Sequence, residues 1–148
     1  MKGVDGVEQT LEKLKFVATA VGTLFTYLLG GFDSTIIFLI IVMCCDYITG
    51  VIKGWFLQEV SSKTGFKGIV KKALIFIVLI IAVQLDNSVE VVDTPIFRTI
   101  VAWFFIANET ISVFENCGAM GLKIPKILSD ALIQIRDKMD SGEVNKIE

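Results

Sequence analysis

Two apolar runs separated by a lysine-rich stretch decide the fold. They are IIFLIIVMCC (residues 36–45), which Asp46 follows, and ALIFIVLIIAVQL (residues 73–85), which closes at Asp86. A hydrocarbon core of about 30 Å needs about 20 helical residues at 1.5 Å rise each, and residues 34–52 and 68–85 supply that length. Soluble helices would show a polar face with a 3.6-residue period, and residues 73–83 show none. The pattern predicts a membrane hairpin whose turn lies on the positively charged side.

Composition supports a membrane protein. The 148-residue chain is 53% hydrophobic, and its mean hydropathy is +0.69. Both values lie above the usual range of soluble domains. We therefore expect one all-α integral membrane domain over residues 1–148, with four transmembrane helices and a C-terminal amphipathic helix.

Hydropathy and turn residues set the expected boundaries. They are a cytoplasmic helix start (1–15), span one (16–32), span two (34–52), a cytoplasmic basic linker (53–67), span three (68–85), an external acidic loop (86–95), span four (96–114), a cytoplasmic amphipathic helix (122–140) and a tail (141–148). Because residues 32–34 leave room only for a tight turn, spans one and two should be antiparallel neighbours. Span one is the least hydrophobic, and if it lies on the membrane surface instead, three spans remain.

Charge placement predicts the orientation. Lysines cluster between spans two and three, and positively charged loops favour the cytoplasm, whereas Asp86, Glu90 and Asp93 mark an external loop. With four spans, both termini would be cytoplasmic, in the cytoplasmic membrane of a bacterial host. The basic residues of the linker region are Lys53, Lys63, Lys67, Lys71 and Lys72.

Span one also carries a stripe of small residues at four-residue steps. Small residues let helix backbones approach closely in lipid. The stripe fits packing inside one chain, an interface between subunits, or a pore lining. Its members are Ala18, Gly22, Thr26 and Gly30.

Two carboxylates lie inside predicted spans. An ionised carboxylate at a span centre is disfavoured by about 2.5 to 3.5 kcal/mol on insertion scales, so Asp46 and Glu109 each need compensation. Lys53 lies about two turns from Asp46. If spans two and four touch, the two carboxylates could share a proton; the alternatives are hydrogen bonds to neighbouring helices, or a gate or water path. The polar neighbours are Thr49, Asn108 and Ser112.

No pattern for catalysis, cofactor or metal binding is found. The chain has no histidine, no phosphate-binding glycine loop and no nucleophile elbow, and its cysteines Cys44, Cys45 and Cys117 form neither a disulfide framework nor a metal site. The basic linker is short and adjoins lipid, which argues against nucleic-acid binding. We expect a protein that is not an enzyme and that uses no cofactor.

Two separated motifs resemble the toxin-secretion/phage-lysis holin family. The first comprises DYITGVIKGW (residues 46–55) and SKTGFKGIVKK (residues 62–72), with Asp86 closing the run that follows; the second is NETISVFENCGAMGLKIPKIL (residues 108–128). The resemblance covers about residues 36–139. Matching positions are Gly50, Gly68, Asp86, Asn108, Glu109, Ser112, Glu115, Asn116, Gly121, Pro125 and Leu128.

The resemblance implies a phage protein that forms homo-oligomers in the host membrane and opens lesions for an endolysin, with relatives linked to toxin export. A proton-coupled transporter and a non-conducting antiholin-like protein are the alternatives. The last helix should lie on the cytoplasmic face and tie subunits or delay assembly. Its predicted apolar face comprises Ile127, Leu128, Ala131, Leu132, Ile135 and Met139.

Overall fold

The chain folds entirely into helices and connecting turns over the part that the computed structural model describes, residues 2–59, 61–89 and 94–141. The all-α prediction is confirmed there. The helices are α1 (Lys2–Leu28), α2 (Ser34–Phe56), α3 (Ser62–Ser88), α4 (Ile96–Ala119) and α5 (Lys126–Asp140). The predicted tail lies outside the described residues beyond Ser141, as do Glu90 and Asp93 of the acidic loop.

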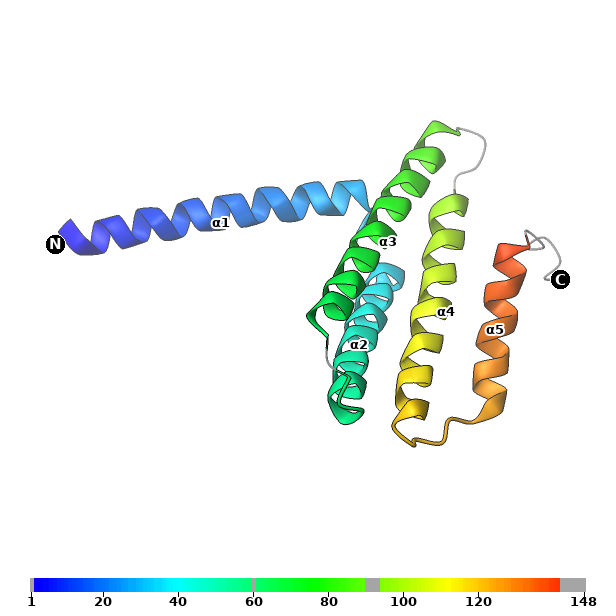
Figure 1. The fold of residues 1–148 in the computed structure, drawn as a ribbon. Helices are drawn as coiled ribbons and strands as arrows, with labels where there is room; N and C mark the ends of the chain where they lie inside the picture. The colour runs from blue at the N-terminus through cyan, green and yellow to red at the C-terminus, as the bar shows by residue number, and fades with distance from the viewer. Residues whose placement is uncertain (1, 60, 90–93, 142–148) are drawn as a thin grey trace.

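Helices α2, α3 and α4 form a three-helix bundle (Figure 1). Helix α4 packs against both others, and the contact between α2 and α3 is smaller, so the predicted hairpin is held together through α4. Its small Ala102 lets the larger side chains approach α4 closely. The core residues include Leu39 and Met43 of α2, Ile75 and Leu79 of α3, and Ala102 and Ile106 of α4.

Three of the described helices, α2, α3 and α4, are long and apolar enough to cross a membrane. Helix α1 is not among them. Lys13 and Lys15 interrupt its apolar sequence, and the uncharged part of the helix beyond them is only about 20 Å long at 1.5 Å per residue. The structure therefore supports a multi-pass membrane protein with three candidate spanning helices.

The basic linker is much shorter than predicted. Helix α2 continues to Phe56 and α3 already begins at Ser62, so the lysines lie on helices. Lysine has a high helix propensity, and its long stem lets the ammonium group reach water from a helix end. Only residues 57–61 connect the two helices, and Gln58 turns the chain with a positive φ of 58°.

Helix α1 does not pack antiparallel to α2, and that prediction is wrong. It projects away from the bundle and crosswise to it (Figure 1). A Schellman motif ends α1: Gly30 has a φ of +69°, and the Gly31 N–H donates to the Thr26 carbonyl at 2.8 Å. Gly31 is also left-handed, with a φ of +110°, so the turn directs the chain sideways instead of back along α1.

Helix α5 lies alongside α4 (Figure 1). It begins at Lys126, so residues 122–125 of the predicted helix form the connection instead. None of its residues is buried, and Ile127, Leu128 and Ile135 remain exposed. Much of the predicted apolar face is thus available to a membrane surface or a partner.

Candidate functional site

An ion cluster lies between the three bundle helices, centred on Lys72 of α3. The Lys72 ammonium group donates to the Asp46 Oδ2 atom of α2 at 2.9 Å and also to the Glu109 Oε2 atom of α4. The side chains of Lys72 and Asp46 are only 14% and 18% exposed. One cation thus joins the two carboxylates that the sequence had marked as costly inside a span.

Asn116 extends the cluster along α4. Its side-chain amide donates to the Asp46 Oδ1 atom at 3.1 Å and lies 3.4 Å from the Thr49 hydroxyl. Thr49 in turn donates to the Cys45 carbonyl of its own helix at 2.8 Å. Asp46 therefore has partners on both oxygens, which offsets the cost of burying its charge.

Glu109 is the most deeply buried member, with a side chain that is 0% exposed. Its Oε2 atom accepts from Lys72, whereas Oε1 has no hydrogen-bond partner among the described residues. The ammonium group of Lys71 lies 3.8 Å from Oε1, and the Lys71 side chain is 66% exposed. Glu109 therefore lies between a buried lysine and one that reaches outward.

The structure brings together most of the predicted polar site. Asp46, Thr49 and Glu109 belong to the cluster, and Ser112 approaches the Asp46 carboxylate. Asn108 precedes Glu109 by one residue, and the 100° step of the helix turns it to a different side of α4. The predicted residues thus converge, with Asn108 as the exception.

The compensation of the two carboxylates agrees with one predicted alternative only in part, since Asp46 accepts a hydrogen bond from Asn116 of the neighbouring α4 but an ion pair with Lys72 was not predicted. Spans two and four do touch, but Lys72 lies between Asp46 and Glu109, so a shared proton is not needed to keep them together. Lys53, predicted as the neighbour of Asp46, is not its ion-pair partner. The sequence analysis had assigned Lys72 to the linker region. Its position directly before the apolar run was the signal that it could point into the bundle.

Two glycines of the motifs lie near the cluster, where an added Cβ atom would be at ordinary contact distance. An added Cβ atom at Gly50 would lie 3.6 Å from the Asn116 amide nitrogen, and one at Gly68 would lie 3.8 Å from the Tyr47 ring. At the end of α4, Gly121 has a left-handed φ of +93°. Pro125 then precedes α5, and Glu115 is exposed. Gly50 and Gly68 lie at contacts between helices, and the left-handed φ of Gly121 allows the turn after α4.

A second polar cluster, which we call the Arg98 clasp, joins α4 to the turn between α1 and α2. The buried Arg98 side chain donates to the Leu29 carbonyl at 2.7 Å, to the Asp33 Oδ2 atom at 2.7 Å and to the Gly31 carbonyl at 3.3 Å. Sequence analysis had not predicted this role. An arginine in the first turn of an apolar helix, with an aspartate before another helix, was the available signal.

Two aspartates of this region cap helices. The Asp33 Oδ1 atom accepts from the Ile36 N–H of α2 at 3.0 Å. The hydrogen bond from Arg98 is the main cause that lowers the pKa of Asp33, which lies before the spanning segment. Asp86 at the end of α3 accepts from the backbone N–H groups of Phe97 and Arg98 at 2.8 and 2.7 Å. Both carboxylates satisfy orphan donors at helix starts.

The small-residue stripe divides between two environments. Ala18, Gly22 and Thr26 are exposed on α1, and no other part of the described chain lies within 4 Å of a Cβ atom added at Gly22. Gly30 lies beyond the helix, where an added Cβ atom would be 3.2 Å from Arg98 Cδ. Gly30 is also exposed, but it lies against Arg98 of the same chain, while the rest of the stripe remains open.

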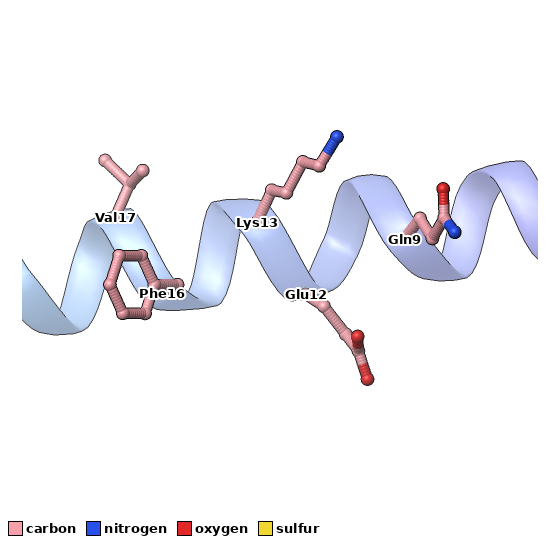
Figure 2. A pocket seen from close by; sticks show the side chains of 5 residues that line it. All are labelled: Gln9, Glu12, Lys13, Phe16 and Val17. Atoms are coloured by element: carbon pink, nitrogen blue, oxygen red, sulfur yellow. The ribbon is translucent and has the colours of Figure 1, made fainter.

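Two surface depressions were found. One lies on α1 alone, and Figure 2 shows Gln9, Glu12, Lys13, Phe16 and Val17 projecting from a single helix with no second element across from them. The other is an apolar groove of about 320 Å³ between α2 and α3, with Lys72 among its lining residues. The polar residues of the first depression all lie on one exposed helix, and the groove between α2 and α3 is mainly apolar.

Three apolar helices joined through a buried ion cluster define a small multi-pass helical membrane protein. The bacteriophage holin family model matches residues 23–137, and the chain belongs to that family. A probable holin of Bacillus phage phi105 is 36% identical over 102 residues, which cover 69% of this chain and 74% of the phage protein.

Relatives also occur in bacteria. An uncharacterized 14.9 kDa protein of Clostridium perfringens is 43% identical over 132 residues, covering 89% of this chain and 99% of the relative. The uncharacterized protein Lmo0128 of Listeria monocytogenes is 40% identical over 130 residues, covering 88% and 90% of the two chains. No solved structure matches the chain.

Proposed function

We propose that this protein is a holin that self-associates in the bacterial cytoplasmic membrane and opens lesions, through which an endolysin or a toxin leaves the cell. The observation that carries the proposal is the ion cluster of Asp46, Lys72, Glu109 and Asn116 between three spanning helices. The chain's membership of the holin family supports it. No catalytic role is proposed.

The cluster explains how one sequence can serve both a lipid-soluble subunit and a water-filled opening. Within a subunit, Lys72 contacts both carboxylates and offsets one of their two negative charges, which lowers the cost of placing them in the membrane. If the helices separate during assembly, the same side chains can be hydrated along an aqueous lumen. A purely apolar bundle would have no such polar lining.

We propose an orientation in which the lysine-rich ends of α2 and α3 face the cytoplasm. The positive-inside rule favours it, and Lys53, Lys63 and Lys67 then lie near anionic headgroups. With three crossings, α5 is cytoplasmic and α1 lies at the outer surface. The alternative with both termini in the cytoplasm requires α1 to cross as a fourth span, and labelling of single cysteines in α1 from either side distinguishes the two.

The C-terminal helix α5 has a proposed role in timing. Its exposed Ile127, Leu128 and Ile135 need cover. Its cationic residues favour the inner membrane surface, which α5 would reach by leaving its position alongside α4. There it would tie neighbouring subunits or delay assembly. Endolysin or toxin would be a functional partner that need not touch the protein.

Inducible expression in a bacterium tests the proposal directly. Dye entry, membrane potential and lysis by a co-expressed endolysin are followed at matched membrane levels. We expect a delayed and abrupt loss of all gradients, followed by lysis. Exchange of the exposed Lys67 for Gln should leave this course unchanged, whereas exchange of Lys72 for Met should alter it. An intact potential at full membrane level, with no endolysin release, would contradict the holin assignment.

The same experiment separates the alternatives. A proton-coupled transporter needs a carboxylate that can exchange a proton, and Glu109 Oε1 has no hydrogen-bond partner among the described residues, so it is the family membership that favours the holin. A steady substrate gradient without lysis would support the transporter. Stable membrane insertion with no leak and a delay of another holin would support an antiholin.

A further inference from the structure

Helix α1 presents apolar side chains that no described part of the chain covers. Val7 and Leu14 are each 61% exposed, and Val21 is 51% exposed. The helix projects from the bundle, which leaves these side chains open along its length (Figure 1). Something outside this chain must therefore cover them.

The spacing of these residues points to a helix as the partner. Apolar residues recur at alternating steps of three and four, an average of 3.5 residues, which is the repeat of a coiled-coil seam. A helix that lies on lipid instead needs a broad apolar stripe with the 3.6-residue period. In residues 7–15 only the seam positions Val7, Leu11 and Leu14 are apolar. Beyond Lys15 the helix also exposes apolar side chains on other faces, namely Phe16, Val17, Leu24 and Tyr27. Among the side chains that the structure describes, the seam of the paired part comprises Val7, Leu11, Leu14, Ala18 and Val21, and Phe25 and Leu28 continue the spacing toward the bundle.

We propose that α1 pairs in an antiparallel coiled coil with α1 of a second copy of this chain. Charge supports the register in which Leu11 packs against Leu14 of the second copy. Glu8 and Lys15 occupy the same flanking position of successive heptads, and in an antiparallel pair these positions face each other. Glu8 of each copy then meets Lys15 of the other, which gives two complementary pairs.

The direction of α1 supports the same arrangement. Because α1 runs crosswise to the bundle, a two-fold axis along the bundle direction makes two α1 helices antiparallel and leaves both bundles with the same membrane orientation (Figure 1). A parallel pair has its two-fold axis along α1, which would turn one bundle upside down. The Arg98 clasp holds the turn that directs α1 outward.

This contact specifies one interface of the self-association proposed above. The register places the pair's centre about 23 Å from the end of each α1, so the two bundles lie about 45 Å apart. The ion cluster and the outer faces of α4 and α5 remain free for other contacts. The α1 pair would thus link subunits before or during lesion formation without closing the bundle.

Disulfide crosslinking of the full chain in bacterial membranes tests the register. Cys44, Cys45 and Cys117 are first replaced by Ser, and a tagged Val7→Cys chain is then co-expressed with an untagged Ala18→Cys chain. The register predicts a mixed disulfide dimer. A Phe25→Cys chain should not crosslink to itself, because the two positions lie about 37 Å apart in the antiparallel pair.

Charge exchange provides an independent readout. Glu8→Lys and Lys15→Glu should each lower the yield of the mixed dimer severalfold, and the double exchange should restore it. Crosslinking at Phe25→Cys would favour a parallel pair and overturn the proposal. Absence of mixed dimers, with α1 cysteines shielded from aqueous reagents, would show that lipid covers the helix and would also overturn it.

Dye entry is measured in the same cells. Mixed dimers without dye entry would support the α1 pair and contradict lesion formation. Dye entry without mixed dimers would contradict only the α1 pair. The two proposals therefore fail under different outcomes.

Discussion

The Lys72 ammonium group of α3 lies 2.9 Å from the Asp46 carboxylate of α2, inside a bundle whose helices are apolar enough to cross a membrane. The same ammonium group contacts Glu109 of α4, so a single side chain joins all three spans. Such a group should contribute to folding far more than an exposed lysine on the same helix.

Exchange of Lys72 for Met should destabilise the bundle by about 3 to 5 kcal/mol, because it leaves two buried carboxylates without their cation. Thermal unfolding of the purified protein in mild detergent measures the effect. Lys67→Met on the exposed side of α3 is the matched control and should change stability little. Equal losses in the two variants would contradict a central role for Lys72.

A combined variant tests the contribution of the two carboxylates to the same contact. If unpaired carboxylates cause the loss, adding Asp46→Asn and Glu109→Gln to Lys72→Met should recover part of the stability, since the neutral side chains cost less to bury. No recovery would show that the loss arises from packing around the lysine stem.

The Arg98 clasp predicts a pH dependence at acid pH. The hydrogen bond from Arg98 lowers the pKa of Asp33 below 3.8. The contact between the two side chains therefore contributes fully to folding stability well above pH 3.8, and this contribution is lost as the pH falls through the lowered pKa. Stability in detergent should therefore fall less steeply toward acid pH in Asp33→Asn than in the unchanged chain. The comparison uses the difference between the two proteins, so that contributions common to both cancel. Identical pH profiles would argue against the contact.

Gly30 and Gly22 form a matched pair for the turn after α1. Gly30→Ala should destabilise the turn by about 1 kcal/mol or more, because alanine disfavours the φ of +69° and its Cβ atom would crowd Arg98. Gly22→Ala lies in open space on the helix and should stabilise α1 by up to about 1 kcal/mol. The rate of proteolysis within α1 and the unfolding temperature are both measured in detergent. Gly30→Ala and Gly22→Ala should change them in opposite directions.

Removal of the residues after Gly121 should shift the time of permeabilisation and leave membrane insertion intact, because the three spanning helices lie upstream. Replacing Leu128 and Leu132 by Ser should act in the same direction, because it removes apolar surface that the membrane or a neighbouring subunit would cover, and full burial of such a side chain contributes about 1.5 to 3 kcal/mol. Exchange of Lys126 for Gln at the start of α5 tests whether positive charge affects the timing independently of the apolar face. Unchanged timing in the first two variants, at equal membrane levels, would show that α5 is a passive tail.

The sequence by itself determined the helices and the class of protein. Apolar runs of spanning length predicted α2, α3 and α4 because a bilayer imposes a length that local composition reveals. Asp46 and Glu109 were recognisable as important because a carboxylate in such a run is costly wherever the helix lies. The motifs around them also identified the family that the comparison confirms.

Only the tertiary structure decided which charges meet and where α1 points. Lys72 and Lys71 are adjacent in the chain, but the rotation and tilt of α3 against α2 and α4 place one inside the cluster and leave the other largely outside. The direction of α1 depends on Arg98, which lies 65 residues from Asp33 in sequence and contacts it only in the folded bundle. Hydropathy reports how each residue interacts with its solvent, whereas these contacts depend on the packing geometry of whole helices.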